Sequence, residues 1–483
     1  MTPLTPRAHA RRPRLHFTPP AGWINDPNGL IYHDGEYHLF YQHHPYSLGW
    51  GPMHWGHAVS RDLVHWEHLP IALAPDELGA IFSGSAVIDH HNTAGFGAGA
   101  MVAIFTHDAP ARQVQSLAYS TDRGRTWTKY AGNPVLAPPD APRDFRDPRV
   151  LWYEGTGRSH WVMLLAVGHE IWIYTSPDLK AWTKASTFGA NYGAHGGVWE
   201  CPELISLPVD GNLPRRWVLV VGVQQGAPGG GSGTQYFVGS FDGTTFTCDD
   251  PPEKVRWADH GADFYAAQAW ASAPGDRTIW LAWMSNWAYA RETPATTWHG
   301  MMTIPRELEL ASGPDGLVLV QRPVRELAAC RGTPFGRSGR ALLPGAVSLD
   351  EVRGEALELI ATFRAEGATA SSFGLRVRVG VGEAARIRYD AVRRELALER
   401  GGTAFRIPSF IGPQVAPLAP RDGLVTLHVL VDTASVEVFA DGGRVVLTSQ
   451  ILPTPESVGV ELFADGGAVV LEELRAWPLP ECA

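Results

Sequence analysis

The sequence predicts an all-β protein in which a five-bladed β-propeller is followed by a C-terminal β-sandwich. An apolar, β-prone run recurs five times at intervals of 56 to 64 residues, and a Ser-x-Asp element recurs four times in the same phase. The 52 glycines and 38 prolines among 483 residues are typical of many short strands joined by turns. The five runs are centred on Leu39, Ala103, Met163, Leu219 and Ala282.

The Ser-x-Asp element marks a turn in each repeat. It begins at Ser60, Ser120, Ser176 and Ser240, and an aromatic residue follows six or seven positions later. An Asp side chain that binds its own backbone, next to an aromatic ring, is typical of a turn after a strand. A repeat of about sixty residues holds four short strands, and such units arranged radially form a propeller. The alternative, a β-sandwich with accidental periodicity, is disfavoured because two separate elements keep one phase.

The same periodicity predicts the domain boundaries. We expect residues 1–14 to be a disordered tail, residues 15–325 to be the propeller and catalytic domain, and residues 326–345 to be a linker rich in Gly, Pro and Arg. Residues 346–483 show alternating apolar runs separated by turn signals such as Asp441-Gly442-Gly443. This pattern predicts a β-sandwich, with the structural role of shielding part of the propeller.

Charge and composition exclude several classes of function. The chain carries 40 Lys and Arg against 50 Asp and Glu, a net charge of −10, so no nucleic-acid partner is expected. No apolar run reaches the ~18 residues of a membrane span, and residues 1–20 lack a hydrophobic signal-peptide core. These features predict a cytoplasmic protein without membrane contact, although export by another route stays open. No ligand spacing predicts a metal or a cofactor, and no feature indicates an oligomeric state.

Carboxylates recur at one phase of the repeat. The strand before each apolar run would line the central channel of a propeller, and the residues at that phase are Asp26, Ser83, Asp147, Glu200 and Asp263. Four blades would therefore direct an acid at one mouth of the channel. An acid paired with a carboxylate nucleophile is the machinery of glycoside hydrolysis, and the 18 Trp residues suit packing against sugar rings. A calcium site is the alternative, but no Dx[DN]x[DN]G spacing supports it.

The residues next to these acids predict different protonation states. Two apolar neighbours favour the protonated form of Glu200. Asn25 and Arg146 are expected to hold their neighbours, Asp26 and Asp147, in the ionised form.

Several stretches resemble glycoside hydrolase family 32, the β-fructofuranosidases that act on fructans. The resemblance rests on WINDPNG (residues 23–29), FRDP (145–148) and ECP (200–202), which occur together and in this order. Ile24 stands where the family usually has Met. The similarity spans roughly residues 15 to 310, and the second domain of that family is a β-sandwich.

Position by position, the resemblance implies roles for the acids. Asp26 resembles the family's nucleophile and Glu200 its acid/base, while Asp147 resembles the carboxylate that holds fructosyl hydroxyls and stabilises the transition state. The resemblance also implies retention through a covalent fructosyl-enzyme. The expected substrate-binding residues are Asn25, Gln42, Trp50, Phe82, Ser83, Arg146 and Trp287, together with Asp263, which is included for its phase in the repeat.

Residues 259–270 and 283–290 are similar to exo-acting inulinases and levanases. The resemblance therefore implies release of terminal β-D-fructose from inulin, levan, fructo-oligosaccharides and sucrose, so fructose-containing oligo- and polysaccharides are the expected partners. Alternatives within the family are a sucrose-preferring invertase and a transfructosylase. A sugar-binding propeller without turnover is an alternative from another class, which the presence of all three carboxylates disfavours.

Overall fold

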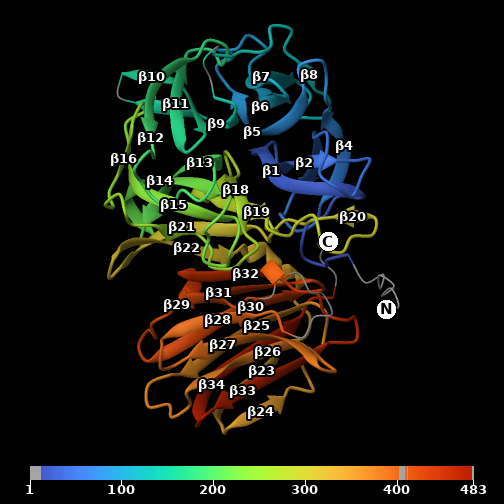
Figure 1. The fold of residues 1–483 in the computed structure, drawn as a ribbon, viewed down its shortest axis with the longest axis vertical. Coiled ribbons are helices and arrows are strands. Elements are labelled where there is room, and N and C mark those ends of the chain that lie inside the picture. The colour runs from blue at the N-terminus through green and yellow to red at the C-terminus, as the bar shows by residue number, and fades with distance from the viewer. Residues whose placement is uncertain are drawn as a thin grey trace.

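The computed structural model describes residues 12–138, 140, 142–155, 157–401, 408–410 and 412–480. These residues form a ring of sheets above two stacked sheets (Figure 1). The helical structure in this part of the chain consists of four short 3₁₀ turns, η1 (Pro274–Asp276), η2 (Arg325–Cys330), η3 (Pro408–Phe410) and η4 (Asp441–Gly443). None of the helices described has the length and apolar character needed to cross a membrane.

Five groups of strands form the ring (Figure 1). The first comprises β1 (Gly22–His33), β2 (Glu36–His44), β3 (His54–Ser60) and β4 (Glu67–Leu73). The second comprises β5 (Ala80–Asp89), β6 (Ala100–Ala109), β7 (Arg112–Ser120) and β8 (Thr128–Lys129). The third comprises β9 (Phe145–Gly155), β10 (Arg158–Val167), β11 (Glu170–Ser176) and β12 (Thr183–Phe188). The fourth comprises β13 (Trp199–Val209), β14 (Asn212–Val223), β15 (Gly233–Phe241), β16 (Phe246–Cys248) and β17 (Arg256–Trp257). The fifth comprises β18 (Tyr265–Ala269), β19 (Ile279–Trp283), β21 (Arg306–Gly313) and β22 (Gly316–Pro323).

The innermost strands close the ring. In order around it, β1, β5, β9, β13 and β18 each contact the next, and β18 returns to β1. The short strand β20 (Trp298–His299) pairs in parallel with β1, so the chain also joins the last blade to the first. The repeated apolar runs are the second strands of the blades, β2, β6, β10, β14 and β19, which explains their burial between neighbouring sheets. The predicted fold class is therefore confirmed.

The Ser-x-Asp elements form turns at the ends of the third strands of the blades. Asp62 accepts hydrogen bonds from the backbone amides of Val64 and His65, and Asp178 does the same for residues 180 and 181. The serine hydroxyl donates to the Asp side chain in both turns. The repeated motif is thus a local device that reverses the chain, as its residues predicted.

The C-terminal domain is a sandwich of two six-stranded sheets. One sheet comprises β23 (Phe335–Leu342), β34 (Val469–Pro478), β25 (Leu357–Arg364), β30 (Leu424–Asp432), β31 (Ser435–Ala440) and β32 (Val445–Gln450). The other comprises β24 (Gly345–Ser348), β33 (Gly459–Asp465), β26 (Ser372–Gly380), β27 (Glu383–Asp390), β28 (Glu395–Glu399) and β29 (Gln414–Pro417). Their inner faces enclose one apolar core.

Two of the expected boundaries need correction. The segment expected to be a linker, residues 326–345, contains most of η2 and all of β23, which pairs along its length with β34. Its many Gly and Arg residues are compatible with an edge strand whose side chains are mostly exposed. Of the expected tail, residues 1–11 lie outside the described residues. Arg14, in contrast, binds the sandwich: its backbone amide donates to Asp432 and its guanidinium donates to Glu355.

A buried charged network joins the two domains. The His16 ring lies between two carboxylates of the sandwich. Its Nδ1 is 2.7 Å from Oδ2 of Asp432, and its Nε2 is 2.8 Å from Oε1 of Glu437. Burial alone would lower the pKa of His16, but the two carboxylates reverse this and raise it to about 9. Arg306 of β21 also donates to Glu437 and, at 3.1 Å, to Asp259. Apolar side chains from both domains pack around this network.

This network makes the stability of the protein depend on pH. Because the pKa of His16 is about 9 in the folded chain against an ordinary 6.5, its contribution is complete below about pH 6.5 and is lost as the pH rises through 9. We expect His16→Gln to lower the free energy of unfolding by on the order of 3 kcal/mol at pH 6. The loss should be much smaller at pH 9.5. Thermal unfolding across this pH range measures both.

The control is His65→Gln, because His65 is an exposed histidine that also pairs with an aspartate. It should leave the pH dependence of the wild type unchanged. Parallel curves of melting temperature against pH for the wild type and His16→Gln would contradict a stabilising His16 cation.

Candidate active site

Each innermost strand carries a β-bulge at the same level of the channel. Two residues of the inner strand lie opposite one residue of the second strand in all five blades. The bulged pairs are Asn25–Asp26, Phe82–Ser83, Asp147–Pro148, Cys201–Pro202 and Ala266–Ala267. A bulge bends the strand and redirects a side chain, and proline fits there because the ladder needs no amide from it. The five bulges therefore direct polar side chains into one funnel.

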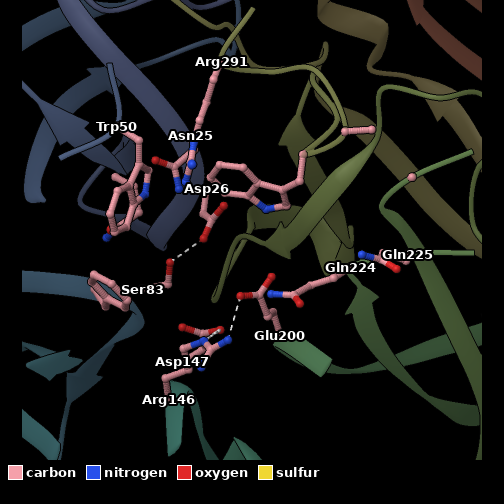
Figure 2. Close-up of a pocket in the computed structure, with 15 residues that line it drawn as sticks. Asn25, Asp26, Trp50, Ser83, Arg146, Asp147, Glu200, Gln224, Gln225 and Arg291 are labelled. Atoms are coloured by element: carbon pink, nitrogen blue, oxygen red, sulfur yellow. Dashed lines mark hydrogen bonds and ion pairs between the residues drawn. The ribbon is translucent and has the colours of Figure 1, made fainter. Parts of the chain in front are cut away.

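These side chains line a cavity of about 630 Å³ at the mouth of the channel. Figure 2 shows Asp26, Asp147 and Glu200 directed into this space from three different blades. Ten of the eleven side chains expected at the site line it, namely Asn25, Asp26, Gln42, Trp50, Phe82, Ser83, Arg146, Asp147, Glu200 and Trp287.

The two carboxylate oxygens of Asp26 differ in their hydrogen bonding. Its Oδ2 accepts a hydrogen bond of 2.7 Å from the Ser83 hydroxyl, with the Cys201 thiol at 3.4 Å. Its Oδ1 is buried and has no hydrogen-bond partner among the described residues. One lone-pair-bearing oxygen is thus oriented and left uncommitted, as an attacking group requires.

Asp147 is fixed more tightly. It adopts a left-handed backbone conformation, with φ of 61°, at the first position of its bulge. Its amide donates to Thr106, and its Oδ2 accepts a 2.9 Å hydrogen bond from the backbone amide of Cys201. A non-glycine residue in this conformation costs on the order of 1 kcal/mol, so the surrounding contacts must hold it in place.

Glu200 is bound through both of its oxygens. Arg146 donates to Oε1 at 2.9 Å and the Tyr265 hydroxyl donates to Oε2 at 2.5 Å. The Arg146 guanidinium also lies 3.9 Å from Asp147 and binds Asp144. One arginine is therefore shared by the carboxylates of two blades.

Burial and the neighbouring negative charges raise the pKa of the two aspartates. Burial is the main cause that raises the pKa of Asp26, the charge of Glu200 adds to it, and the Ser83 hydrogen bond opposes it. Burial likewise raises the pKa of Asp147, which reaches about 7 despite Arg146. The expectation that Asn25 and Arg146 would keep these two aspartates readily ionised is therefore wrong. At Asp147 the nearby Arg146 does not offset the effect of burial.

Aromatic rings form the walls of the cavity. Trp287 stacks on Trp23 with ring centroids 6.4 Å apart and an interplanar angle of 21°. Trp50, which is 40% exposed, meets Phe82 edge-on at 6.0 Å. Arg291 lies over both Trp50 and Trp287 at the rim. Apolar ring faces beside a cluster of acids suit a ligand with both C–H faces and hydroxyl groups.

Asp263 is the expected site residue that the structure does not bring to the cavity. It is fully buried at the junction with the sandwich, where it accepts hydrogen bonds from Tyr289 and Arg400. The phase of the repeat placed it close to the fifth inner strand, but it lies two residues before β18 begins and three residues before the bulge at Ala266–Ala267. Tyr265, immediately before that bulge, is the residue that reaches Glu200.

Five lining residues were not anticipated, namely Gln224, Gln225, Gly231, Ala288 and Arg291. The two glutamines directly follow β14, at the same end of their blade as Gln42 in β2, and this placement after an apolar run was an available signal. The other three lie on loops, where the period of the repeat carries no information. Among the described residues, no three His, Cys, Asp or Glu side chains are grouped so that they could hold a metal ion.

A propeller funnel with a free carboxylate oxygen, a second carboxyl group bound by a tyrosine and an arginine, and aromatic walls defines a glycoside hydrolase site. Residues 16–323 match the model of the glycosyl hydrolases family 32 N-terminal domain, and residues 329–478 match that of the family 32 C-terminal domain. The chain belongs to glycosyl hydrolase family 32 and is a glycoside hydrolase.

Characterised relatives match along most of the chain. A levanase of Bacillus subtilis (strain 168) is 52% identical over 97% of this chain and 70% of its own length. An extracellular exo-inulinase of Aspergillus awamori is 38% identical over 92% of this chain and 90% of its own. The crystal structure of exo-inulinase from Aspergillus awamori superposes with a TM-score of 0.93 at 36% identity, covering 98% of this chain and 100% of that one.

These relatives correct the expected location. The exo-inulinases of Aspergillus awamori and Aspergillus niger are named as extracellular enzymes, which contradicts the expectation of a cytoplasmic protein. That expectation rested on the composition of the N-terminal residues, which does not decide where an enzyme of this family works.

The Ser83 hydroxyl provides a test of the electrostatics. Because its hydrogen bond lowers the pKa of Asp26, Ser83→Ala should raise that pKa, so a higher pH is needed to ionise the carboxylate. We expect the acidic limb of kcat/KM against pH to move upward by about one pH unit. Ser83→Thr, which keeps a hydroxyl, should move it less. An unchanged acidic limb in Ser83→Ala would show that ionisation of Asp26 does not control this limb.

Proposed function

We propose that the protein is an exo-acting, retaining β-fructofuranosidase that removes terminal fructose from fructans and cleaves sucrose. The observation that carries the proposal is the convergence of Asp26, Asp147 and Glu200 on one cavity whose walls are aromatic. The similarity to a levanase and an exo-inulinase along nearly the whole chain supports fructans as substrates.

The mechanism follows from the position of each acid. Glu200 protonates the glycosidic oxygen while Oδ1 of Asp26 attacks the anomeric carbon, which forms a fructosyl ester on Asp26 and releases the rest of the chain. Glu200 then removes a proton from a water molecule that attacks the ester, and the configuration is retained. Tyr265 and Arg146 hold the two oxygens of Glu200, so its proton is exchanged from a fixed position.

Asp147 has a different task. Its Oδ2 accepts a hydrogen bond from the Cys201 amide, and the positive charge of Arg146 nearby favours the ionised form of Asp147. A carboxylate fixed in this way suits the acceptance of hydrogen bonds from sugar hydroxyls, which strengthen as positive charge develops on the furanose ring.

A buried polar layer beneath the acids supports attack at the chain end. It contains Asn28, Ser85, Arg149, Glu203 and Gln268, one from each inner strand and each two or three residues beyond the bulge level. Arg149 pairs with Glu203 at 2.6 Å, and the Gln268 amide donates to the carbonyl of Pro202 at 3.2 Å. These buried links between blades lie beyond the acids along the inner strands, which supports a pocket that accepts the terminal sugar of a chain.

The product profile tests exo-attack. With inulin or levan, free fructose should be the only product from the first turnovers onward, and the polymer should shorten gradually. Early accumulation of fructo-oligosaccharides would contradict exo-attack. A sugar transferred to sucrose in preference to water would favour the transfructosylase alternative.

Substitution of the acids tests the roles. Asp26→Ala and Glu200→Ala should each lower kcat by at least about 10³-fold on sucrose. With an aryl β-D-fructofuranoside, whose leaving group needs no proton, azide should accelerate Glu200→Ala and give a β-configured fructosyl azide. Asp26→Ala should give no β-configured product.

Glu309→Gln serves as the control, since Glu309 lies on β21 in an ion pair with Arg322 away from the cavity. It should retain wild-type kcat. Near-normal turnover by Glu200→Ala on sucrose would refute its role as acid.

A further inference from the structure

The segment from Met284 to Arg291 contacts the active-site cavity on one side and the C-terminal domain on the other. Trp287, Ala288 and Arg291 line the cavity. Tyr289 lies between them in sequence but is buried on the other side, with 2% of its surface exposed, where its ring meets Phe410 of the sandwich at 5.1 Å. One wall of the active site therefore has its reverse side against the C-terminal domain.

Arg400 of the sandwich is the centre of this contact. Its Nη2 donates to Asp263 at 2.6 Å and to the Tyr289 hydroxyl at 2.7 Å. Its other nitrogens donate to Ser449 and to the carbonyl of Phe410. The side chain is 3% exposed, so these contacts take the place of water.

The contact also balances a buried charge. Burial raises the pKa of Asp263, and Arg400 is the first influence that opposes this. The Tyr289 hydroxyl donates to the same carboxylate at 2.6 Å. Removing the guanidinium would leave Asp263 buried without its cation and would take away one partner of Tyr289, a disturbance that buried ion pairs tolerate poorly.

Further bonds connect this contact to the cavity wall. Gln450, the last residue of β32, donates from its backbone to Asp263 and from its side chain to the carbonyl of Met284. On the propeller side, Asn286 donates to the carbonyls of Gly230, Ser232 and Ala262. Gly231 lies so close to Asn286 that a Cβ there would come within 2.1 Å of its Oδ1. The segment is thus fixed by the sandwich behind it and by the loop between β14 and β15 beside it.

We propose that Arg400 is a positioning residue for substrate binding, through which the C-terminal domain holds the Trp287 wall of the active site. The inference rests on the proposed function, because Trp287 is taken to face the fructosyl ring. It gives the sandwich a part in catalysis beyond covering the propeller, through one side chain that touches no substrate.

The effect should fall on binding more than on chemistry. Asp26, Asp147 and Glu200 are held by contacts within β1, β5, β9, β13 and β18, and Arg400 contacts none of them. A displaced wall weakens the hold on substrate and transition state alike, which raises KM and leaves kcat nearly constant.

The test compares steady-state kinetics on sucrose and inulin for the full-length wild type, Arg400→Gln, Arg400→Lys and Tyr289→Phe. We expect KM to rise about tenfold in Arg400→Gln with kcat within about threefold of wild type. Arg400→Lys, which keeps the cation, should recover part of the loss. The matched control is Arg376→Gln, because Arg376 forms an ion pair with Glu461 within the sandwich. It should leave KM unchanged.

An unchanged KM in a folded Arg400→Gln, with or without a fall in kcat, would overturn the inference. If Arg400→Gln does not fold, Arg400→Lys and Tyr289→Phe carry the test, since they keep most of the packing. Their effects on KM should be non-additive in the double variant, and strict additivity would also overturn it. A wild type that releases no fructose from either sugar would refute the proposed function. An active wild type, together with variants that have the same KM as the wild type, would refute this inference alone.

Discussion

The structure depends on a bulge in each of the five inner strands. Residues along a regular strand alternate strictly between its two faces, and the bulge interrupts this alternation beside Asp26, Asp147 and Glu200. The bulge costs backbone strain, visible in the left-handed conformations of Asp147 and Cys201.

Charge is distributed in the molecule so that buried acids are rarely alone. Around the active site, burial and the neighbouring carboxylates raise the pKa of Asp26 and Asp147, and Arg146 opposes this only in part at Asp147. Between the domains the balance is the reverse. There His16 and Arg306 lower the pKa of Glu437 against the effect of burial, and the ions hold the domains together. Burial and ion pairing thus act in both places, but burial prevails at the active site and ion pairing prevails between the domains.

The sequence could predict features that repeat. The apolar runs, the Ser-x-Asp turns and the phase of the acids repeat from blade to blade, so the propeller and the cavity residues Asp26, Ser83, Asp147 and Glu200 could be predicted from the repeat. The other six predicted residues that line the cavity came from the resemblance to family 32. Asp263 was misplaced because phase locates a residue along a strand but does not tell which neighbour takes its side chain, here Arg400 from the other domain. The strand β23 was missed because an exposed edge strand lacks apolar alternation. The pKa shifts depend on burial, which sequence neighbours do not determine.

The identity of the residue that carries the sugar tests the central claim most directly. Glu200→Ala should be mixed with an aryl β-D-fructofuranoside, quenched within the first turnover, digested and analysed by mass spectrometry. The account requires a fructosyl unit on the peptide that contains Asp26, in an amount approaching one per enzyme, and an unmodified peptide for Asp147. A fructosyl unit on Asp147, or full turnover with no covalent intermediate at any time, would contradict the assembly of a nucleophile and an acid by the bulged inner strands.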